Sequence, residues 1–298
     1  MNNKGIIFTI SSAVIFGIAP IFASMSYLYG NTALNMTFFR NFFTVPVFII
    51  LCKKNGLSLK IGIEEFKKML VISLFGSLIT GTCLYEAYTF VGVGTTTTIH
   101  FMYPFIVCLA NALIFKERIG KYRTICLIVC LVGVAFFVDI NDINNIKGII
   151  IAFISAISYA FFILYLDKEK LANMHPYVFC FYLSSIVSAF FLVFNFFKPI
   201  IIIDLSLKTY VLMIIAALGT SYLASVLFNV GVKEIGSSKA AIFSLFEPVF
   251  SVVFSALLLK ETINIFTATG CALLVAGILG LSIYDMRMEK NNIAANHS

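Results

Sequence analysis

The second half of this chain repeats the first. Residues 92–133 align without gaps onto residues 236–277, an offset of 144 positions. Pro104 then coincides with Pro248, inside an apolar stretch in each half. A repeated pair of interrupted apolar segments is typical of secondary transporters, whose ligand site lies where the two repeats meet. The repeat therefore predicts a molecule of two related halves with its site between them.

The composition places these halves in a lipid bilayer. Of the 298 residues 60% are hydrophobic and 12% are charged, whereas an average soluble domain is about 25% charged. The apolar runs reach the roughly 20 residues that a membrane-spanning helix needs. They are apolar on all sides rather than alternating, which excludes a strand-built barrel. We therefore expect an all-α integral membrane protein.

We expect about ten transmembrane helices in two inverted five-helix repeats, because five spans per half reverse the direction of the second half. The first repeat is predicted at residues 1–140, the second at 141–286, and a disordered tail at 287–298. The expected spans are 5–29, 33–52, 68–91, 94–115, 122–140, 148–166, 176–197, 208–232, 238–259 and 264–284.

Most lysines and arginines fall in loops on the side of the N-terminus, including the run from Lys53 to Lys68. Because such residues stay in the cytoplasm, both termini are predicted cytoplasmic, in a multi-pass protein of the cell (plasma) membrane. The net charge of +7 is then explained by the basic residues of the cytoplasmic loops, and we expect no nucleic-acid partner.

Polar side chains recur at helical spacing within four of the spans, so they share faces that can close around one space. We predict that residues of these faces bind the substrate. They are Ser244, Glu247 and Ser251 on the ninth span, His100, Tyr103 and Asn111 on the fourth, and Tyr222 and Asn229 on the eighth.

Glu247 is the most informative of these residues because it lies near the middle of its span. An ionisable group at that depth is costly unless it is solvated or paired, so it marks a functional site by default. It could bind an ammonium group or carry a proton during transport. The alternative is a structural carboxylate bonded to serines or to a neighbouring helix.

Arg40 and Glu86 lie at similar predicted depth, where a pair would lower the cost of both charges. The pair could be a clamp between helices or an outer gate. Pro104 and Pro248 each remove a helical hydrogen bond, which frees the carbonyls of His100 and Ser244. Such helix breaks predict a cavity-lining position, with a simple packing kink as the alternative.

Several kinds of chemistry have no counterpart in the sequence. There is no Gly-rich phosphate loop, no cluster with metal-ligand spacing and no Cys-x-x-Cys among the seven cysteines. We expect no ATP-driven step, no metal, no cofactor and no catalytic residues.

The pattern Glu247-Pro248-Val249-Phe250 followed by Lys260-Glu261 resembles the ninth-span motif of EamA-domain transporters, within the drug/metabolite transporter superfamily. The first-repeat version is Tyr103-Pro104-Phe105, closing with Lys116-Glu117, and Arg40 is similar as well. The resemblance implies ten helices in an inverted repeat around a central cavity. It also implies transport of small metabolites, often amino acids and mostly outward.

The sequence thus predicts a secondary-active or facilitative transporter that works by alternating access and exports amino acids or related amines. An organic-cation or drug exporter is the nearest alternative. A membrane-embedded lipid-modifying enzyme and a sensor or scaffold without transport activity are alternatives from other classes. The expected partners are a small-molecule substrate, membrane lipid and protons as a candidate coupling ion, with monomer and homodimer both left open.

Overall fold

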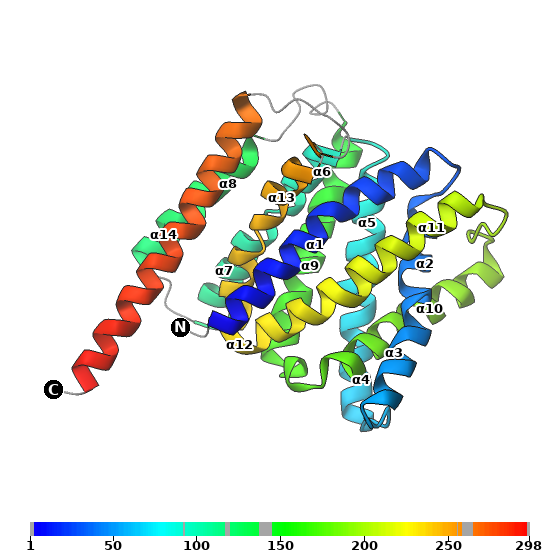
Figure 1. The fold of residues 1–298 in the computed structure, drawn as a ribbon, viewed down its shortest axis with the longest axis horizontal. Helices are drawn as coiled ribbons and strands as arrows, with labels where there is room; N and C mark the ends of the chain where they lie inside the picture. Colours follow the sequence, from blue (N-terminus) through cyan, green and yellow to red (C-terminus); the bar gives the residue numbers. More distant parts are fainter. Residues whose placement is uncertain are drawn as a thin grey trace.

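The computed structural model describes residues 3–91, 93–116, 120–136, 145–254, 256–257 and 265–296. Every regular element in these ranges is a helix (Figure 1). Seven helices are long and apolar enough to cross a membrane, and two shorter apolar helices cover Thr124–Ala135 and Ile265–Leu281. The predicted all-α membrane fold is therefore confirmed. Glu117, Lys260 and Glu261 lie outside the described residues.

The first half runs from α1 to α8. Its elements are α1 (Asn3–Tyr27), α2 (Ala33–Phe42), α3 (Thr44–Lys54), α4 (Ile63–Val71), the π-helix η1 (Ile72–Leu78), α5 (Ile79–Ala87), α6 (Val93–His100), α7 (Tyr103–Leu113) and α8 (Lys121–Ala135). Helices α2 and α3 follow one another across Phe43, and α4, η1 and α5 are continuous.

The second half runs from α9 to α14. Its elements are α9 (Ile146–Lys168), the 3₁₀ turn η3 (Leu171–Asn173), α10 (Pro176–Phe197), α11 (Leu207–Ala216), the π-helix η4 (Ala217–Ala224), α12 (Ser225–Phe243), α13 (Phe246–Phe254) and α14 (Ile265–Asn296).

Gly236 divides α12 between two spans. Its φ of 78° and ψ of 166° are not helical, and the chain turns there. A glycine suits this position because a side chain would clash at positive φ. Counted with this turn, the described helices make ten passes. The last helix continues to Asn296, so the prediction of a disordered tail from residue 287 is wrong over most of its length.

Helix starts follow the sequence repeat. Asn3 and Ile146 begin α1 and α9, and Ala33 and Pro176 begin α2 and α10, each pair 143 positions apart. Lys121 and Ile265 begin α8 and α14, 144 positions apart. The two halves therefore share one pattern of helices, and equivalent residues can be compared directly.

Two sets of equivalent helices from the two halves pack antiparallel. In the α8–α14 pair, at the left of Figure 1, Tyr122 stacks on Tyr284 with ring centroids 4.9 Å apart, and Phe136 stacks on Phe266 at 6.5 Å. Residue numbers rise along one helix as they fall along the other. The pair formed by α2 and α3 with α10 runs the same way: Phe38 meets Phe191, and Thr44 donates a hydrogen bond to Ser184 at 3.1 Å.

The π-helices η1 and η4 occur in the third span of their respective halves. A π turn leaves backbone carbonyls that need other partners. The Ser158 hydroxyl on α9 lies 2.6 Å from the carbonyl of Phe75 and 3.0 Å from that of Gly76 in η1. At the end of η4, Ser225 donates to the carbonyl of Thr220 at 2.8 Å. Both irregular turns are therefore held by serine hydroxyls.

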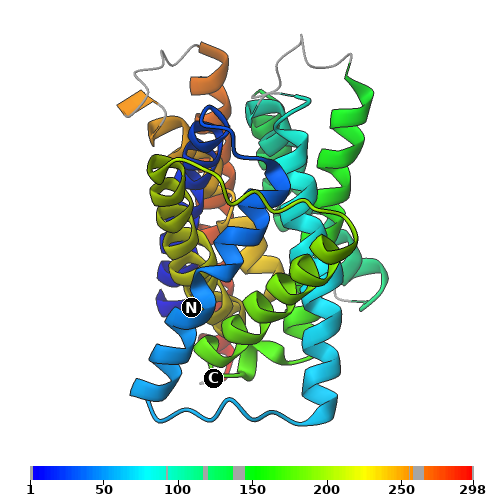
Figure 2. The same cartoon turned by 90° about the vertical axis from the view of Figure 1, so that its right-hand side faces the viewer.

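We call the end of the bundle where α1 begins the inner end, and the opposite end the outer end. The helices pack more closely at the inner end. There α12 packs against α9 and α7. The equivalent packing at the outer end, of α5 and α6 against α1 and α13, is weaker in the described part of the chain. Figure 2 shows the loop between α3 and α4 crossing the inner end.

Candidate functional site

A cavity lies between the two halves and holds about 880 Å³ of empty space, its open part included. Helices of both halves supply its wall. The lining residues are Phe16, Ala19, Arg40, Ser77, Thr80, Gly81, Leu84, Tyr85, Tyr88, His100, Tyr159, Phe162, Leu166, Phe179, Leu183, Thr220, Ser225, Phe228, Asn229 and Glu247. A concave space rich in aromatic side chains, with a few convergent polar groups, is the usual form of a small-molecule site.

Many of these residues are equivalent in the repeat. Pairs in which both members line the cavity are Phe16 and Tyr159, Ala19 and Phe162, Arg40 and Leu183, Ser77 and Thr220, and Tyr85 and Phe228. The cavity is therefore built by the same positions of the two halves, on the plane where they meet.

Glu247 enters the cavity from the first turn of α13. Its backbone N–H donates to the Ser244 carbonyl at 2.9 Å, which closes the turn between α12 and α13. The partial positive charge of a helix N-terminus favours a carboxylate in that turn. The carboxylate has no ion-pair partner among the described residues, and the Ser244 hydroxyl donates to its own helix at Ala240. Glu247 is thus an acid available to a ligand.

Asn229 faces the same cavity from α12 and is 1% exposed. Neither its amide nitrogen nor its amide oxygen has a hydrogen-bond partner. A buried amide left unpaired costs free energy that a bound polar group would recover. Asn229 therefore supplies both a donor and an acceptor to the cavity.

His100 lines the cavity at the end of α6, where its partners are already in place. Its Nδ1 lies 2.9 Å from the Ser155 hydroxyl, which donates to the Ala152 carbonyl at 2.6 Å. Because that hydroxyl hydrogen is used, Nδ1 acts as the donor to Ser155. The ring also packs against Tyr103 and Tyr159, with centroids 5.3 Å away in each case.

Arg40 does not form the predicted ion pair with Glu86. Its Nη1 donates to the hydroxyl of Tyr85 at 3.0 Å, and its guanidinium lies 5.3 Å from the centre of that ring. Consecutive residues of a helix point about 100° apart, so α5 presents Tyr85 to Arg40 and turns Glu86 away. Glu86 does not line the cavity.

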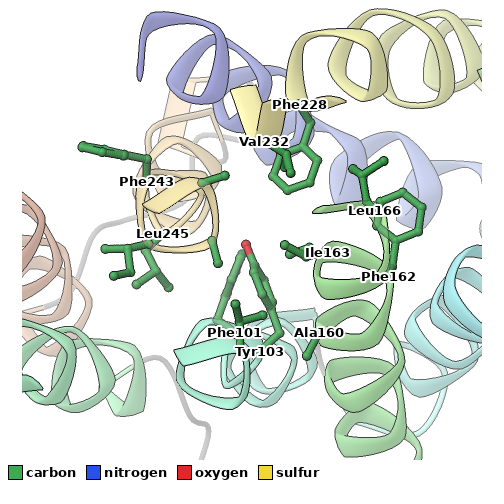
Figure 3. Close-up of a cluster of buried hydrophobic side chains, with 14 of the residues drawn as sticks. Phe101, Tyr103, Ala160, Phe162, Ile163, Leu166, Phe228, Val232, Phe243 and Leu245 are labelled. Carbon is green, nitrogen blue, oxygen red and sulfur yellow. The ribbon is translucent and has the colours of Figure 1, made fainter. Parts of the chain in front are cut away.

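Five other residues expected to bind the substrate lie outside the cavity lining. Tyr103 is fully buried, and its hydroxyl points into the apolar cluster of Figure 3. Tyr222 packs edge-on against Phe48. Asn111 donates to the hydroxyls of Ser237 and Ser238, at 3.2 and 2.7 Å. Ser244 and Ser251 are the remaining two.

The helix breaks at the two prolines are present. Helix α6 ends at His100 and α7 begins at Tyr103, with Pro104 in its first turn, and α13 likewise begins two residues before Pro248. The Ser244 carbonyl, however, has a partner, because it accepts a hydrogen bond from the Glu247 N–H. The breaks position His100 and Glu247 at helix ends beside the cavity.

The sequence analysis missed Tyr85 and Tyr88, which line the cavity on either side of Glu86. Counting from Ser77 through Gly81 in steps of three or four residues leads to both tyrosines. The predicted depth that pointed to Glu86 does not show which face of the helix a residue occupies. In the second half η4 ends at Ala224, and the next two cavity-facing turns carry Ser225 and Asn229.

Asp167 was also missed. Its carboxylate accepts a hydrogen bond from the backbone N–H of Ser237 at 3.0 Å, directly after the turn at Gly236. With the contacts of Asn111 to Ser237 and Ser238, it ties the inner ends of α7 and α9 to the start of the ninth span. The charged residues that follow the sixth span could be recognised in the sequence, but the contact of Asp167 with Ser237 could not.

A multi-pass membrane bundle of two repeats around a shared cavity is the architecture of secondary membrane transporters. The comparisons with known proteins agree. The EamA-like transporter family matches residues 3–138 and again residues 146–283, and the chain belongs to this family.

A relative from Bacillus subtilis (strain 168), the uncharacterized transporter YyaM, is 23% identical over 225 residues, which are 71% of this chain and 70% of that protein. A solved crystal structure covers 94% of this chain and 98% of its own, with a TM-score of 0.78 at 14% identity, and supports the fold alone. The chain is therefore a membrane transporter.

Proposed function

We propose that this protein is a secondary carrier that moves small amines, amino acids first among them, by alternating access. The observation that carries the proposal is Glu247, an acid without an ion-pair partner in a cavity between two repeats. Beside it, the unpartnered amide of Asn229 offers further hydrogen bonds. Together they suit the ammonium group of a small substrate, and the aromatic wall suits its side chain.

The two repeats are inverted in this proposal. Antiparallel packing of α8 with α14 and of α3 with α10 is what inverted halves would give. Closer packing at the inner end and weaker packing at the outer end are what one of two exchanged states would give. Exchange of these contacts between the two ends would expose the cavity to each side in turn.

The proposal also covers domain bounds and topology. The five-helix repeats are residues 1–140 and 141–286. The protein lies in the plasma membrane, and both of its termini face the cytoplasm. Direction is outward, and protons taken up by Glu247 are the coupling ion. The chain performs transport without cofactor or catalysis.

An organic cation without a carboxylate is the second candidate substrate. Tyr85, Tyr88 and Tyr159 around the cavity can receive a cationic head by cation–π contact. The unpaired guanidinium of Arg40 in the same wall disfavours it, because like charges repel in a space of low dielectric.

The test is efflux from proteoliposomes loaded with a pool of amino acids, polyamines and quaternary amines, read by mass spectrometry. Wild type and Glu247→Gln are compared side by side at two pH values. Selective loss of a few species from wild type alone supports the carrier and places the site at Glu247. Equal loss from both proteins keeps the carrier and makes Glu247 structural. Absence of efflux from folded protein contradicts the proposal.

A further inference from the structure

We propose that Arg40 forms a subsite for a carboxylate at the outer side of the cavity. The inference rests on the proposed function and makes it more specific: the substrate presents an acid group as well as an amine. The guanidinium lines the cavity, and no acidic side chain within 4.0 Å pairs with it in the described ranges. A buried guanidinium without a counter-ion in a membrane is costly, and a bound anion removes that cost.

The guanidinium is oriented with one edge free. Nη1 is engaged by the Tyr85 hydroxyl at 3.0 Å, whereas Nε is buried without a hydrogen-bond partner. Nε and Nη2 form the edge that carboxylates bind with two parallel hydrogen bonds. Engagement of Nη1 by Tyr85 leaves that edge for the ligand and holds the fork in place.

Space beside this edge comes from Gly81. A Cβ added at Gly81 would lie 3.7 Å from Arg40 Nη2 and 3.2 Å from Thr37 Cγ2. The equivalent residue of the second half is Ala224, so the repeat itself does not require a glycine here. Gly81 also lines the cavity. Its missing side chain leaves room beside Nη2.

The neighbouring groups select a monoanion. One guanidinium supplies one positive charge, and Glu247 adds negative charge to the same cavity. A dianionic phosphate would therefore be repelled, whereas a carboxylate would gain two charge-assisted bonds.

The second half shows that the cation is not a requirement of the fold. Leu183 occupies the position equivalent to Arg40 and also lines the cavity. The backbone thus accepts an apolar residue at this depth. Arg40 and Glu247 therefore define a polarity across the cavity, with the carboxylate toward Arg40 and the amine toward Glu247.

The experiment is efflux from proteoliposomes loaded with the common amino acids together with their decarboxylated amines, such as phenylalanine with phenethylamine. Wild type is expected to prefer the amino acids. Arg40→Gln should reduce that preference about 10- to 100-fold, the size of a lost charge-assisted interaction. Gly81→Ala, which leaves Arg40 intact, should reduce it in the same direction by crowding the Nη2 edge.

Lys208→Gln is the matched control, because it removes an exposed positive charge at the outer end without touching the cavity. It should leave the preference unchanged. If wild type exports the amines and not the amino acids, or if Arg40→Gln is folded and keeps the preference, the subsite is wrong while the carrier stands. Absence of efflux of both groups would instead overturn the carrier and the subsite with it.

Discussion

Gly5 in the first half and Gly148 in the second meet equivalent neighbours. A Cβ added at Gly5 would lie 2.7 Å from the Cβ of Glu234, and one added at Gly148 would lie 2.8 Å from the Cβ of Phe90. Glu234 and Phe90 are themselves equivalent, 144 positions apart. Small residues at helix crossings let backbones approach closely in a membrane. What the repeat preserves is therefore the packing of helix backbones.

The cavity wall does not preserve the repeat. Arg40 lines the cavity, and its equivalent in the second half is Leu183. Glu247 also lines the cavity, whereas its equivalent in the first half, Tyr103, does not. A symmetric scaffold lets two exchanged states have similar free energies. A substrate with different ends requires an asymmetric wall, and the two charged residues supply the asymmetry.

The inner and outer closures differ as well. At the inner end Asp167 accepts the Ser237 N–H. The residue equivalent to Asp167 at the outer end is Ser24, whose hydroxyl oxygen is buried without a partner. The tie at Asp167 thus has no counterpart at Ser24, and the outer end uses other contacts, such as the two hydrogen bonds between the Asn35 amide and the backbone of Ile202.

The largest effect on transport is expected at Glu247, whose equivalent position in the first half is Tyr103. Glu247→Gln should lower the ratio of Vmax to KM for an exported amine about 30- to 5000-fold, since removing one partner of a buried charge pair costs about 2–5 kcal/mol. Tyr103→Phe should lower it less than about threefold, because that hydroxyl has no hydrogen-bond partner. Initial rates in proteoliposomes measure both. Equal losses in the two variants would show that the wall is functionally symmetric.

The next largest effect is expected at the inner tie. Asp167→Ala removes the acceptor of the Ser237 N–H, a charge-assisted hydrogen bond worth about 1.5–3 kcal/mol. Hydrogen exchange of peptides spanning residues 233–243 should become at least tenfold faster. Asp204→Ala, at an exposed loop residue of the outer end, is the control and should leave these peptides unchanged. Unaltered exchange in Asp167→Ala would contradict a role of the tie in closure.

A smaller effect, about 1–3 kcal/mol of overpacking, is expected where the halves remain alike. An added Cβ at Gly277 would lie 2.5 Å from the Cys130 Sγ and 3.0 Å from the Cys126 carbonyl oxygen, and one at Gly133 would lie 3.0 Å from the Gly270 carbonyl oxygen. Alanine at either glycine should therefore lower the midpoint of thermal unfolding in detergent, and at Gly277 by at least as much as at Gly133. Gly219→Ala is the control, because its nearest neighbour is 3.6 Å away. A larger loss at Gly133 than at Gly277 would contradict this ranking.

The repeat, the spans and the importance of the ninth span could be predicted from sequence, because an offset and a hydropathy pattern are local properties. Residue-level placement could not be predicted so well. Predicted depth alone does not distinguish Glu86 from its neighbour Tyr85, which lies on the face of α5 that lines the cavity. Asn111 and Asp167 meet Ser237 and Ser238 only because the chain turns at Gly236. Such contacts depend on tertiary structure that one sequence does not show.

The smallest effects separate two buried asparagines, one from each half. Asn111 is bonded to two serines, whereas Asn229 has no partner for either amide atom, and both are 1% exposed. Asn111→Leu should therefore destabilise the protein by about 1–2 kcal/mol, because it leaves serine hydroxyls unpaired. Asn229→Leu should be neutral or slightly stabilising while it lowers substrate affinity a few-fold. Thermal unfolding and transport KM are measured on both variants. If the amide of Asn229 binds the ligand, Asn111→Leu is the less stable variant and Asn229→Leu has the higher KM. If that amide instead stabilises the fold, the variant with the higher KM is also the less stable one.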